Sequence, residues 1–240
     1  MKILTYNIQA GIGTRSVSDY VLKAHHQLID TPAKRRTLTN IGKFIRDFDI
    51  VCLQEVDLGG RRSGFKSQLA RIMEVSGLAY SAEQTNRIVG RSSRHGNAIL
   101  SRFPIKNIGD NKLPSRIPGR GKLLCKISGL TVINTHLSLR DAVQAEQLDF
   151  IETYLQDSAP VVMCGDLNCR AHAPHLEAFA QRNDLNVITG QHSLSYPSWN
   201  ARRDLDHILV SQSLGPMKAK AINTQLSDHL PVCAEFDFQD

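Results

Sequence analysis

Four strand-like segments follow one another between residues 79 and 137 with no helical segment between them, and this run constrains the fold most. The segments are AYSAEQ (79–84), NAILSRFPI (97–105), GKLLCKIS (121–128) and LTVINTHL (130–137). Strands that are joined directly by loops pair antiparallel, whereas parallel neighbours need a long crossover. The run therefore predicts antiparallel pairing alongside some parallel pairing.

Amphipathic helices and further strands surround this run. Helices are predicted over 18–30, 31–48, 65–78, 141–157 and 173–182, and strands over 2–8, 49–56, 160–168, 205–211, 217–223 and 231–238. The segment 31–48 is the clearest helix, because Thr31 can cap it and Pro32 suits its first turn. No linker-like stretch divides the chain. We expect one domain over residues 1–240, of the α+β or mixed α/β class, with sheets covered by helices.

The charge and cysteine content limit the possible partners and compartment. The 240 residues carry a formal charge of +6 and five cysteines. A basic chain favours an anionic partner such as nucleic acid, a phospholipid headgroup or a phosphorylated metabolite, although a solvated surface explains the charge equally well. The cysteines are scattered and mostly lie in apolar runs, which indicates buried thiols in a reducing compartment, the cytoplasm. No signal peptide or membrane-spanning stretch is expected.

Polar residues directly abut most of the buried strands. They are Asn7, Glu55, His136, Asp166 and Asn168 at strand ends, and Asp206, Asp228 and His229 at strand starts. A buried charge or amide without a partner destabilises the fold, so these residues are expected to share interaction partners. We expect them to converge at one edge of the sheets, where they bind a cation and an anion.

The residue types narrow the chemistry. Glu, Asp and Asn are hard oxygen donors that suit Mg²⁺, Mn²⁺ or Ca²⁺ better than zinc or copper. The chain contains no G-x-S-x-G motif, no P-loop and no G-x-G-x-x-G. Hard ligands together with two histidines indicate metal-assisted attack of water on a phosphate ester.

Seven motifs in order along the chain resemble the endonuclease/exonuclease/phosphatase superfamily. They are YNIQAG, VCLQEVD, GNAILSRFPI, INTHLSLR, GDLNC, LDHILVS and SDHLPV. The resemblance implies a four-layer α/β/β/α sandwich of two mostly antiparallel sheets flanked by helices. It also implies an in-line attack of water on phosphorus with Mg²⁺ or Mn²⁺ as cofactor.

The resemblance also implies roles for the metal and water ligands. By match, Glu55 holds the metal with Asn7 and Asp228 nearby. Asp166 orients or deprotonates the attacking water, and Asn168 positions that water or the phosphate.

The matched histidines face the phosphate. His229 bonds a non-bridging phosphate oxygen or transfers a proton, with Asp206 fixing and charging its ring. His136 contacts the phosphate from the other side. Either Asp166 or His229 can serve as the base.

His136 also bears on the branch of the superfamily. Abasic-site nucleases of the family carry tyrosine there, which argues against base-excision repair. Pancreatic-type deoxyribonucleases pair this histidine with a glutamate before the strand corresponding to NAILSR, and RSSRHG at 91–96 contains none. The histidine-bearing bacterial hydrolases, neutral sphingomyelinases and inositol-phosphate phosphatases remain.

Basic and aromatic residues outside the motifs are candidate substrate contacts. They are Arg62, which follows the predicted strand that carries Glu55, and Arg94, His95 and Asn97 within the basic stretch NRIVGRSSRHGN. The alternative to substrate contact is that these residues lie in solvated loops. Residues 18–30 form a lid or a surface helix. Tyr196 and Trp199 stack on a base, dip into a lipid interface, or pack a loop.

We therefore expect a metal-dependent phosphoric ester hydrolase, a phosphodiesterase or nuclease. The alternatives are a phospholipid or inositol-phosphate phosphodiesterase or phosphatase and, more distantly, a non-catalytic binding module of the same fold. The latter should lack a residue such as Glu55, Asp166, Asn168 or His229, and all four are present.

Overall fold

Two six-stranded sheets form the centre of the molecule in the computed structural model, which describes residues 1–116, 118–155 and 159–237. The first sheet has the order β11-β12-β1-β2-β4-β3. Its strands are β1 (Lys2–Asn7), β2 (Ile50–Asp57), β3 (Tyr80–Val89), β4 (Ser93–Ser101), β11 (Lys220–Ala221) and β12 (Val232–Glu235). The second has the order β5-β6-β7-β8-β10-β9. Its strands are β5 (Ile105–Lys112), β6 (Gly121–Ile127), β7 (Leu130–His136), β8 (Val161–Asp166), β9 (Leu185–Val187) and β10 (Asp206–Ser211).

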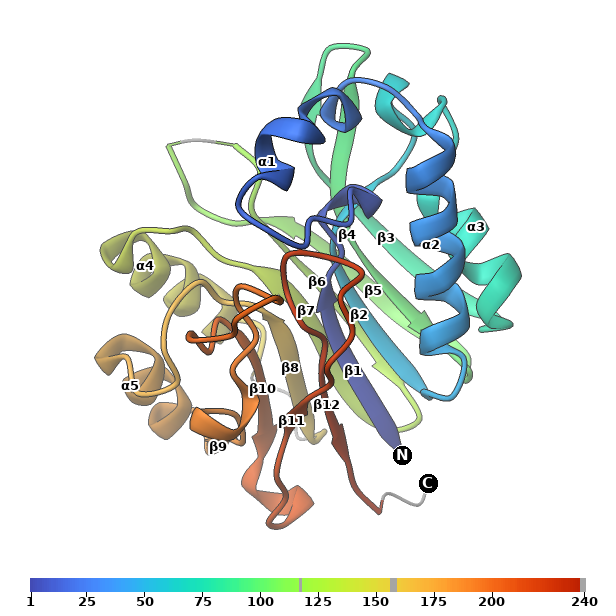
Figure 1. Ribbon diagram of the computed structural model, residues 1–240. Helices are drawn as coiled ribbons and strands as arrows, with labels where there is room; N and C mark the ends of the chain where they lie inside the picture. The colour runs from blue at the N-terminus through green and yellow to red at the C-terminus, as the bar shows by residue number, and fades with distance from the viewer. Residues whose placement is uncertain (117, 156–158, 238–240) are drawn as a thin grey trace.

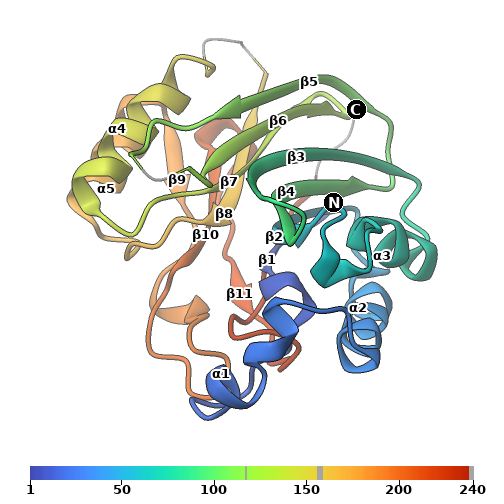
Figure 2. The same cartoon turned by 90° about the horizontal axis from the view of Figure 1, so that it is seen from above.

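Helices cover the outer face of each sheet (Figures 1 and 2). The helices are α1 (Asp19–Leu22), α2 (Pro32–Ile45), α3 (Gln68–Ser76), α4 (Asp141–Glu152) and α5 (Pro174–Arg182). Short 3-10 turns are η1 (Gln9–Gly11), η2 (Ala24–Gln27), η3 (Arg61–Ser63), η4 (Gln191–Ser193) and η5 (Gln212–Leu214). The helices α2 and α3 pack on the first sheet, and α4 and α5 pack on the second. The predicted α/β/β/α sandwich is confirmed.

The apolar core lies in three layers, which follow from side chains alternating across each strand. Ile3 and Cys52 of the first sheet meet Val132 and Val162 of the second in the central layer. Their neighbours along the same strands point outward, as Leu4 does toward α2. This explains why both sheets have almost continuous apolar strands, because each strand is buried on two faces.

The strand pairing places a common edge opposite the chain ends. β1 pairs with β2, and β7 with β8, in parallel, while every other pairing among the described strands is antiparallel. β1, β2, β7 and β8 therefore end at the edge where β10 and β12 begin. That edge lies toward α1 in Figure 1, away from both termini.

Some predicted elements differ from the structure. The single helix expected over 18–30 is broken into α1 and η2, and the strand expected over 97–105 divides at Pro104 into β4 and β5. The basic stretch expected as a loop is a hairpin, since β3 continues to Val89 and β4 already starts at Ser93. β9 was missed, and the strand expected over 217–223 is reduced to β11. Positions 156–157 and 238 of the predicted helix and strand lie outside the described residues.

Candidate active site

Six predicted site residues converge at the common sheet edge because of strand register. His136, Asp166 and Asp206 are directly paired across β7, β8 and β10. Gly165 allows this close approach, because a Cβ atom there would lie 1.9 Å from the carbonyl oxygen of Thr135. The other three come from the facing sheet: Asn7 ends β1, Glu55 lies near the end of β2, and His229 precedes β12.

Asn7 links two carboxylates from different sheets. Its Nδ2 donates to Glu55 Oε1 at 3.2 Å and to Asp166 Oδ2 at 2.9 Å, while its Oδ1 accepts from the backbone of Gln9 at 3.0 Å. Glu55 sits where the β2–β4 pairing changes register, with φ +56°. Such a backbone costs on the order of 1 kcal/mol and persists where the surroundings require it. The bulge and Asn7 thus fix Glu55 beside Asp166.

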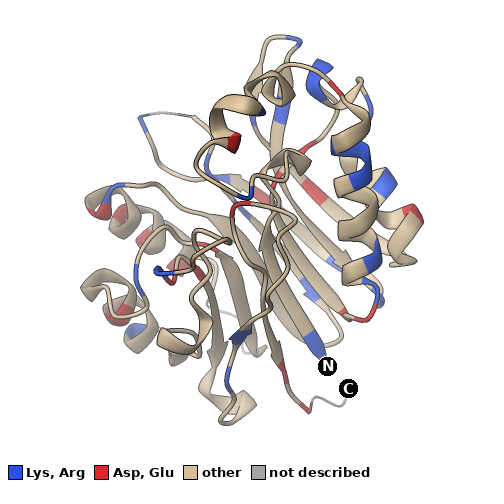
Figure 3. Cartoon of the chain, viewed as in Figure 1, with Lys and Arg blue, Asp and Glu red and all other residues tan. Residues whose placement is uncertain are grey.

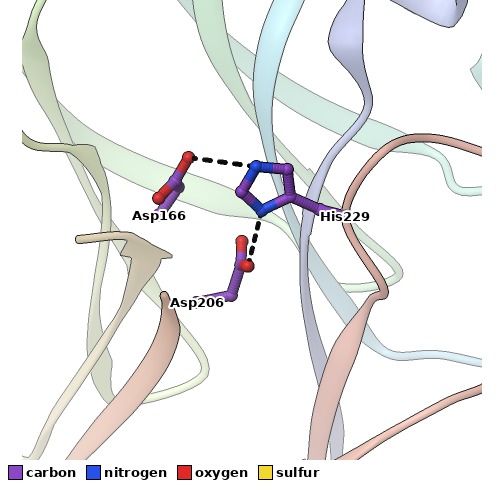
Figure 4. A group of neighbouring side chains, drawn as sticks. All are labelled: Asp166, Asp206 and His229. Carbon is purple, nitrogen blue, oxygen red and sulfur yellow. Dashed lines mark hydrogen bonds and ion pairs between the residues drawn. The ribbon is translucent and has the colours of Figure 1, made fainter. Parts of the chain in front are cut away.

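His229 lies between two aspartates (Figure 4). Its Nδ1 lies 2.7 Å from Asp206 Oδ2, and its Nε2 lies 3.8 Å from Asp166 Oδ2. Burial by itself lowers the pKa of His229, but the charges of Asp206 and Asp166 raise it well above its ordinary value. Burial, with added repulsion from Asp206 and Glu55, raises the pKa of Asp166 to about 7. At neutral pH the imidazole is therefore charged, while Asp166 is close to its midpoint.

Arg120 contacts His136, which in turn lies next to Asp166. Its Nη1 lies 2.5 Å from His136 Nε2, and that nitrogen lies 3.3 Å from Asp166 Oδ2. Burial and the neighbouring charge of Arg120 hold the pKa of His136 well below its ordinary value. His136 is therefore neutral and accepts from Arg120. The hydrogen-bond partner of this histidine is thus an arginine of the loop before β6, and not a residue of the stretch 91–96.

Asp228 is held by groups from the N-terminal segment. Its Oδ2 accepts from Gln9 Nε2 at 2.9 Å and from the Tyr20 hydroxyl at 2.8 Å. The Tyr20 hydroxyl is also 3.2 Å from that of Tyr196, whose ring lies 4.8 Å from the ring of His229. The segment predicted as a lid or surface helix thus contacts the site through Tyr20.

The donor set fits a hard divalent cation. Asp166, Asp206 and His229 each offer a ligand atom, and these atoms lie within 4.8 Å of one another. A protonated imidazole cannot bind a metal, however, and His229 is kept charged by Asp206. Glu55 therefore fits better, because a cation bound there would relieve the repulsion between its carboxylate and that of Asp166.

Asn168 supports the same edge from the turn after β8. It has φ +55°, its backbone N–H donates to Asp166 Oδ1 at 3.2 Å, and its Nδ2 donates to Leu137 O at 3.0 Å. It fixes both Asp166 and the end of β7.

A cleft of about 970 Å³ opens beside Glu55 and His136. Four arginines line it: Arg87, Arg116, Arg120 and Arg140. Within the described part of the chain, Arg87, Arg116 and Arg140 form no ion pair. Unneutralised guanidinium groups around a cleft favour an anionic occupant.

The four predicted substrate contacts are placed differently from one another. His95 and Asn97 line the cleft. Asn97 Nδ2 donates inward, to Gln84 Oε1 and Gly121 O. Arg94 is exposed and is not among the residues that line the cleft. Arg62 is buried and paired with Asp57, and its Nη2 lies 2.9 Å from His95 Nδ1.

Arg62 therefore supports His95 rather than facing the cleft. Burial and the charge of Arg62 lower the pKa of His95 to about 4, which keeps that ring neutral at the cleft wall.

Comparison with known proteins identifies the family of the chain. The model of the endonuclease/exonuclease/phosphatase family matches residues 4–229. The chain belongs to this family. An uncharacterised family relative, YbhP of Escherichia coli K12, is 28% identical, with 98% of this chain and 95% of YbhP covered.

Solved structures share the family fold at lower identity. The mannosyl-6-phosphatase Bt3783 of Bacteroides thetaiotaomicron superposes with a TM-score of 0.71 at 19% identity, covering 99% of this chain and all of that one. The catalytic domain of human Nocturnin gives a TM-score of 0.70 at 19% identity, covering all of this chain and 93% of that one. The family includes both phosphatases and nucleases, so membership supports phosphoester hydrolysis without fixing the substrate.

Sequence reasoning missed Arg120, Gln9 and Tyr20. Arg120 lies in the loop SRIPGRGK, whose density of Arg, Gly and Pro was the available signal. Gln9 and Tyr20 carry no such signal, because their partner Asp228 is more than 200 residues away.

Proposed function

We propose that this protein is a divalent-metal-dependent phosphodiesterase that hydrolyses its substrate by in-line attack of water. The observation that carries the proposal is the group Asp206–His229–Asp166 beside Asn7 and Glu55, in which a hydrogen bond of 2.7 Å joins His229 to Asp206 and an ion pair of 3.8 Å joins it to Asp166. A bound Mg²⁺ or Mn²⁺, held by Glu55, would supply Lewis-acid charge to a phosphate oxygen.

Asp166 is the candidate base by position. Its Oδ2 lies 2.9 Å from Asn7 Nδ2, 3.3 Å from His136 Nε2 and 3.8 Å from His229 Nε2, at the centre of the group, where a base can reach the attacking water. His229 is already protonated, because its pKa is raised well above the ordinary value. Its Nε2–H can then donate to a phosphate oxygen or to the leaving group, while Asp206 keeps the ring oriented.

Arg120 and His136 form the opposite wall of the reaction site. The guanidinium of Arg120 has donors beyond the one that meets His136. Positive charge and fixed donors at this position stabilise the oxygens on which charge builds up in the transition state.

The arginine-lined cleft suits a substrate that extends beyond the reacting phosphate. A nucleic acid strand is one such substrate, and a phospholipid headgroup or inositol phosphate is the alternative. The complete site argues against a non-catalytic module of the same fold. All five cysteines are buried and free, which supports the proposed cytoplasmic location.

Hydrolysis of bis-p-nitrophenyl phosphate beside p-nitrophenyl phosphate tests the proposal. Each ester is assayed with Mg²⁺, with Mn²⁺ and with EDTA, and wild type is compared with Asp166→Asn. We expect cleavage of the diester only, with loss of activity in EDTA and roughly a thousandfold loss in the variant.

Asp149→Asn is the matched control, since Asp149 is an exposed carboxylate on α4 paired with Arg182. It should keep wild-type activity. Cleavage of the monoester alone would replace the phosphodiesterase by a phosphatase. Diester cleavage that survives EDTA would remove the metal from the mechanism.

A further inference from the structure

Most of the large apolar side chains that are exposed among the described residues lie on three segments: residues 17–29, the loop after η3, and the β3–β4 hairpin. We call this surface the rim. Its apolar members, with exposed fractions, are Val17 (73%), Val21 (78%), Leu22 (68%), Leu28 (61%), Ile29 (40%), Phe65 (56%), Ile88 (61%) and Val89 (41%). Single exposed apolar residues are ordinary, but a group of them marks an interaction surface.

Hydrogen bonds join the three segments that carry the rim, although these segments are separate in sequence. η2 and η3 are joined by Arg62 Nη1, which donates to Gln27 Oε1 at 3.3 Å, and by Lys34 Nζ, which bonds the carbonyl oxygens of both His26 and Arg62. η3 and the β3–β4 turn are joined by the N–H of Arg61, which donates to Arg91 O at 2.8 Å. Figure 1 shows α1 and the β3–β4 hairpin tip at the same end of the molecule.

Cations are interleaved with the apolar side chains. Arg61, Lys66, Arg91 and Arg94 are exposed on η3, on the loop after it and on the hairpin, and they form no ion pair within the described residues. The guanidinium of Arg91 lies 5.6 Å from the centre of the Phe65 ring. Figure 3 shows Lys and Arg at this hairpin tip. The rim therefore combines apolar side chains with net positive charge.

We infer that the rim docks on the surface of an anionic phospholipid bilayer. Shallow insertion of aliphatic and aromatic side chains, flanked by basic residues, is the common mode of peripheral membrane binding. Side chains exposed by more than half protrude, so they suit a soft, flat surface rather than a rigid partner that fits a groove. A nucleic acid backbone would pair with the arginines but would leave Val21 and Leu22 in water.

Two residues connect the rim with the candidate active site. Tyr20 lies between the exposed Val21 of α1 and Asp228, which its hydroxyl contacts. Arg87 precedes Ile88 on the hairpin and lines the cleft. Through Arg87, a bilayer bound to the rim would lie next to one wall of the cleft. The inference stands on the surface itself and does not require the proposed reaction.

None of the described helices is long and apolar enough to cross a membrane, so the test concerns a bilayer surface. Sedimentation with phosphatidylcholine vesicles, with and without phosphatidylglycerol, provides it, in EDTA so that hydrolysis plays no part. We expect wild type to bind the anionic vesicles and to be released by salt. Val21→Ser/Leu22→Ser and, separately, Arg61→Gln/Arg91→Gln should each lower the partition coefficient roughly tenfold.

Matched variants lie away from the rim. Ile108→Ser removes an apolar side chain that is 55% exposed on β5, and Lys43→Gln/Lys106→Gln removes two exposed charges from α2 and β5. Both should bind as wild type does, and thermal unfolding checks that every variant is folded.

Wild type that stays in the supernatant with anionic vesicles at low salt would overturn the inference, as would equal losses in the matched variants. A third refuting result is binding of a single-stranded oligonucleotide instead, lost in Arg61→Gln/Arg91→Gln and kept in Val21→Ser/Leu22→Ser. That would make the rim a nucleic-acid contact. Because binding is measured without turnover, a failed rim and a failed phosphodiesterase assignment can be told apart.

Discussion

The Arg62→Met variant distinguishes an arginine that supports the site from one that binds substrate. The ion pair between Arg62 and Asp57 has side chains only 3% and 0% exposed. Methionine keeps an unbranched apolar stem, but it leaves the Asp57 carboxylate buried without its counter-charge. Such a loss costs roughly 3–5 kcal/mol of unfolding free energy. We expect the lower end, because Asp57 Oδ1 still accepts from the N–H groups of Gly59 and Gly60.

Urea unfolding at neutral pH measures this cost. With a slope of about 3 kcal/mol per M, the midpoint should fall by about 1 M or more. Asp57→Asn/Arg62→Met should regain part of the loss, because neither charge is then buried. Added salt should change the difference little, since a buried pair is poorly screened.

The difference should also depend on pH, with a definite sign. Although burial by itself raises the pKa of Asp57, its bonds to Arg62 and Gly60 lower the pKa below the ordinary value of 3.8. The pair therefore contributes its full stability above pH 3.8. That contribution is lost as the pH falls through the lower pKa of the folded state, so the gap between wild type and Arg62→Met should narrow in acid.

A loss of unfolding free energy below about 1 kcal/mol in Arg62→Met, the range of an exposed pair, would refute this reasoning. If the KM for the diester rose at the same time, Arg62 would be a substrate contact.

Three further variants test the site. Glu55→Gln should weaken Mn²⁺ binding in calorimetry at least tenfold; unchanged affinity would exclude Glu55 as a ligand. Asp206→Asn should lower kcat for the diester by roughly a hundredfold or more and shift the His229 imidazole titration to lower pH by NMR; an unmoved titration would remove Asp206 as the cause of the raised pKa. Arg120→Gln should lower kcat/KM roughly a hundredfold, and a loss confined to thermal stability would limit Arg120 to packing.

The direction in which each basic side chain points is a feature that the sequence did not predict. Arg62 follows the strand that carries Glu55 and looked like a cleft residue, but the turn at η3 directs it inward to Asp57. Arg94 and His95 are adjacent in sequence, yet only His95 lines the cleft, because neighbouring residues on a strand point to opposite faces. The sequence predicted the chemistry of these side chains, and the hairpin decided which of them meets the cleft.

The sequence by itself determined the fold class, with sheets covered by helices, and the residue types of the site, while the four-layer arrangement was implied by the family resemblance. Apolar runs and helical periodicity are local properties, and a polar side chain directly after a buried strand can be recognised without knowing its partner. Only the tertiary structure decided that Arg120 accompanies His136, that Gln9 and Tyr20 hold Asp228, and that three separate segments form the rim. These contacts join parts of the chain that only the pairing of two sheets brings together, and no local pattern encodes that pairing.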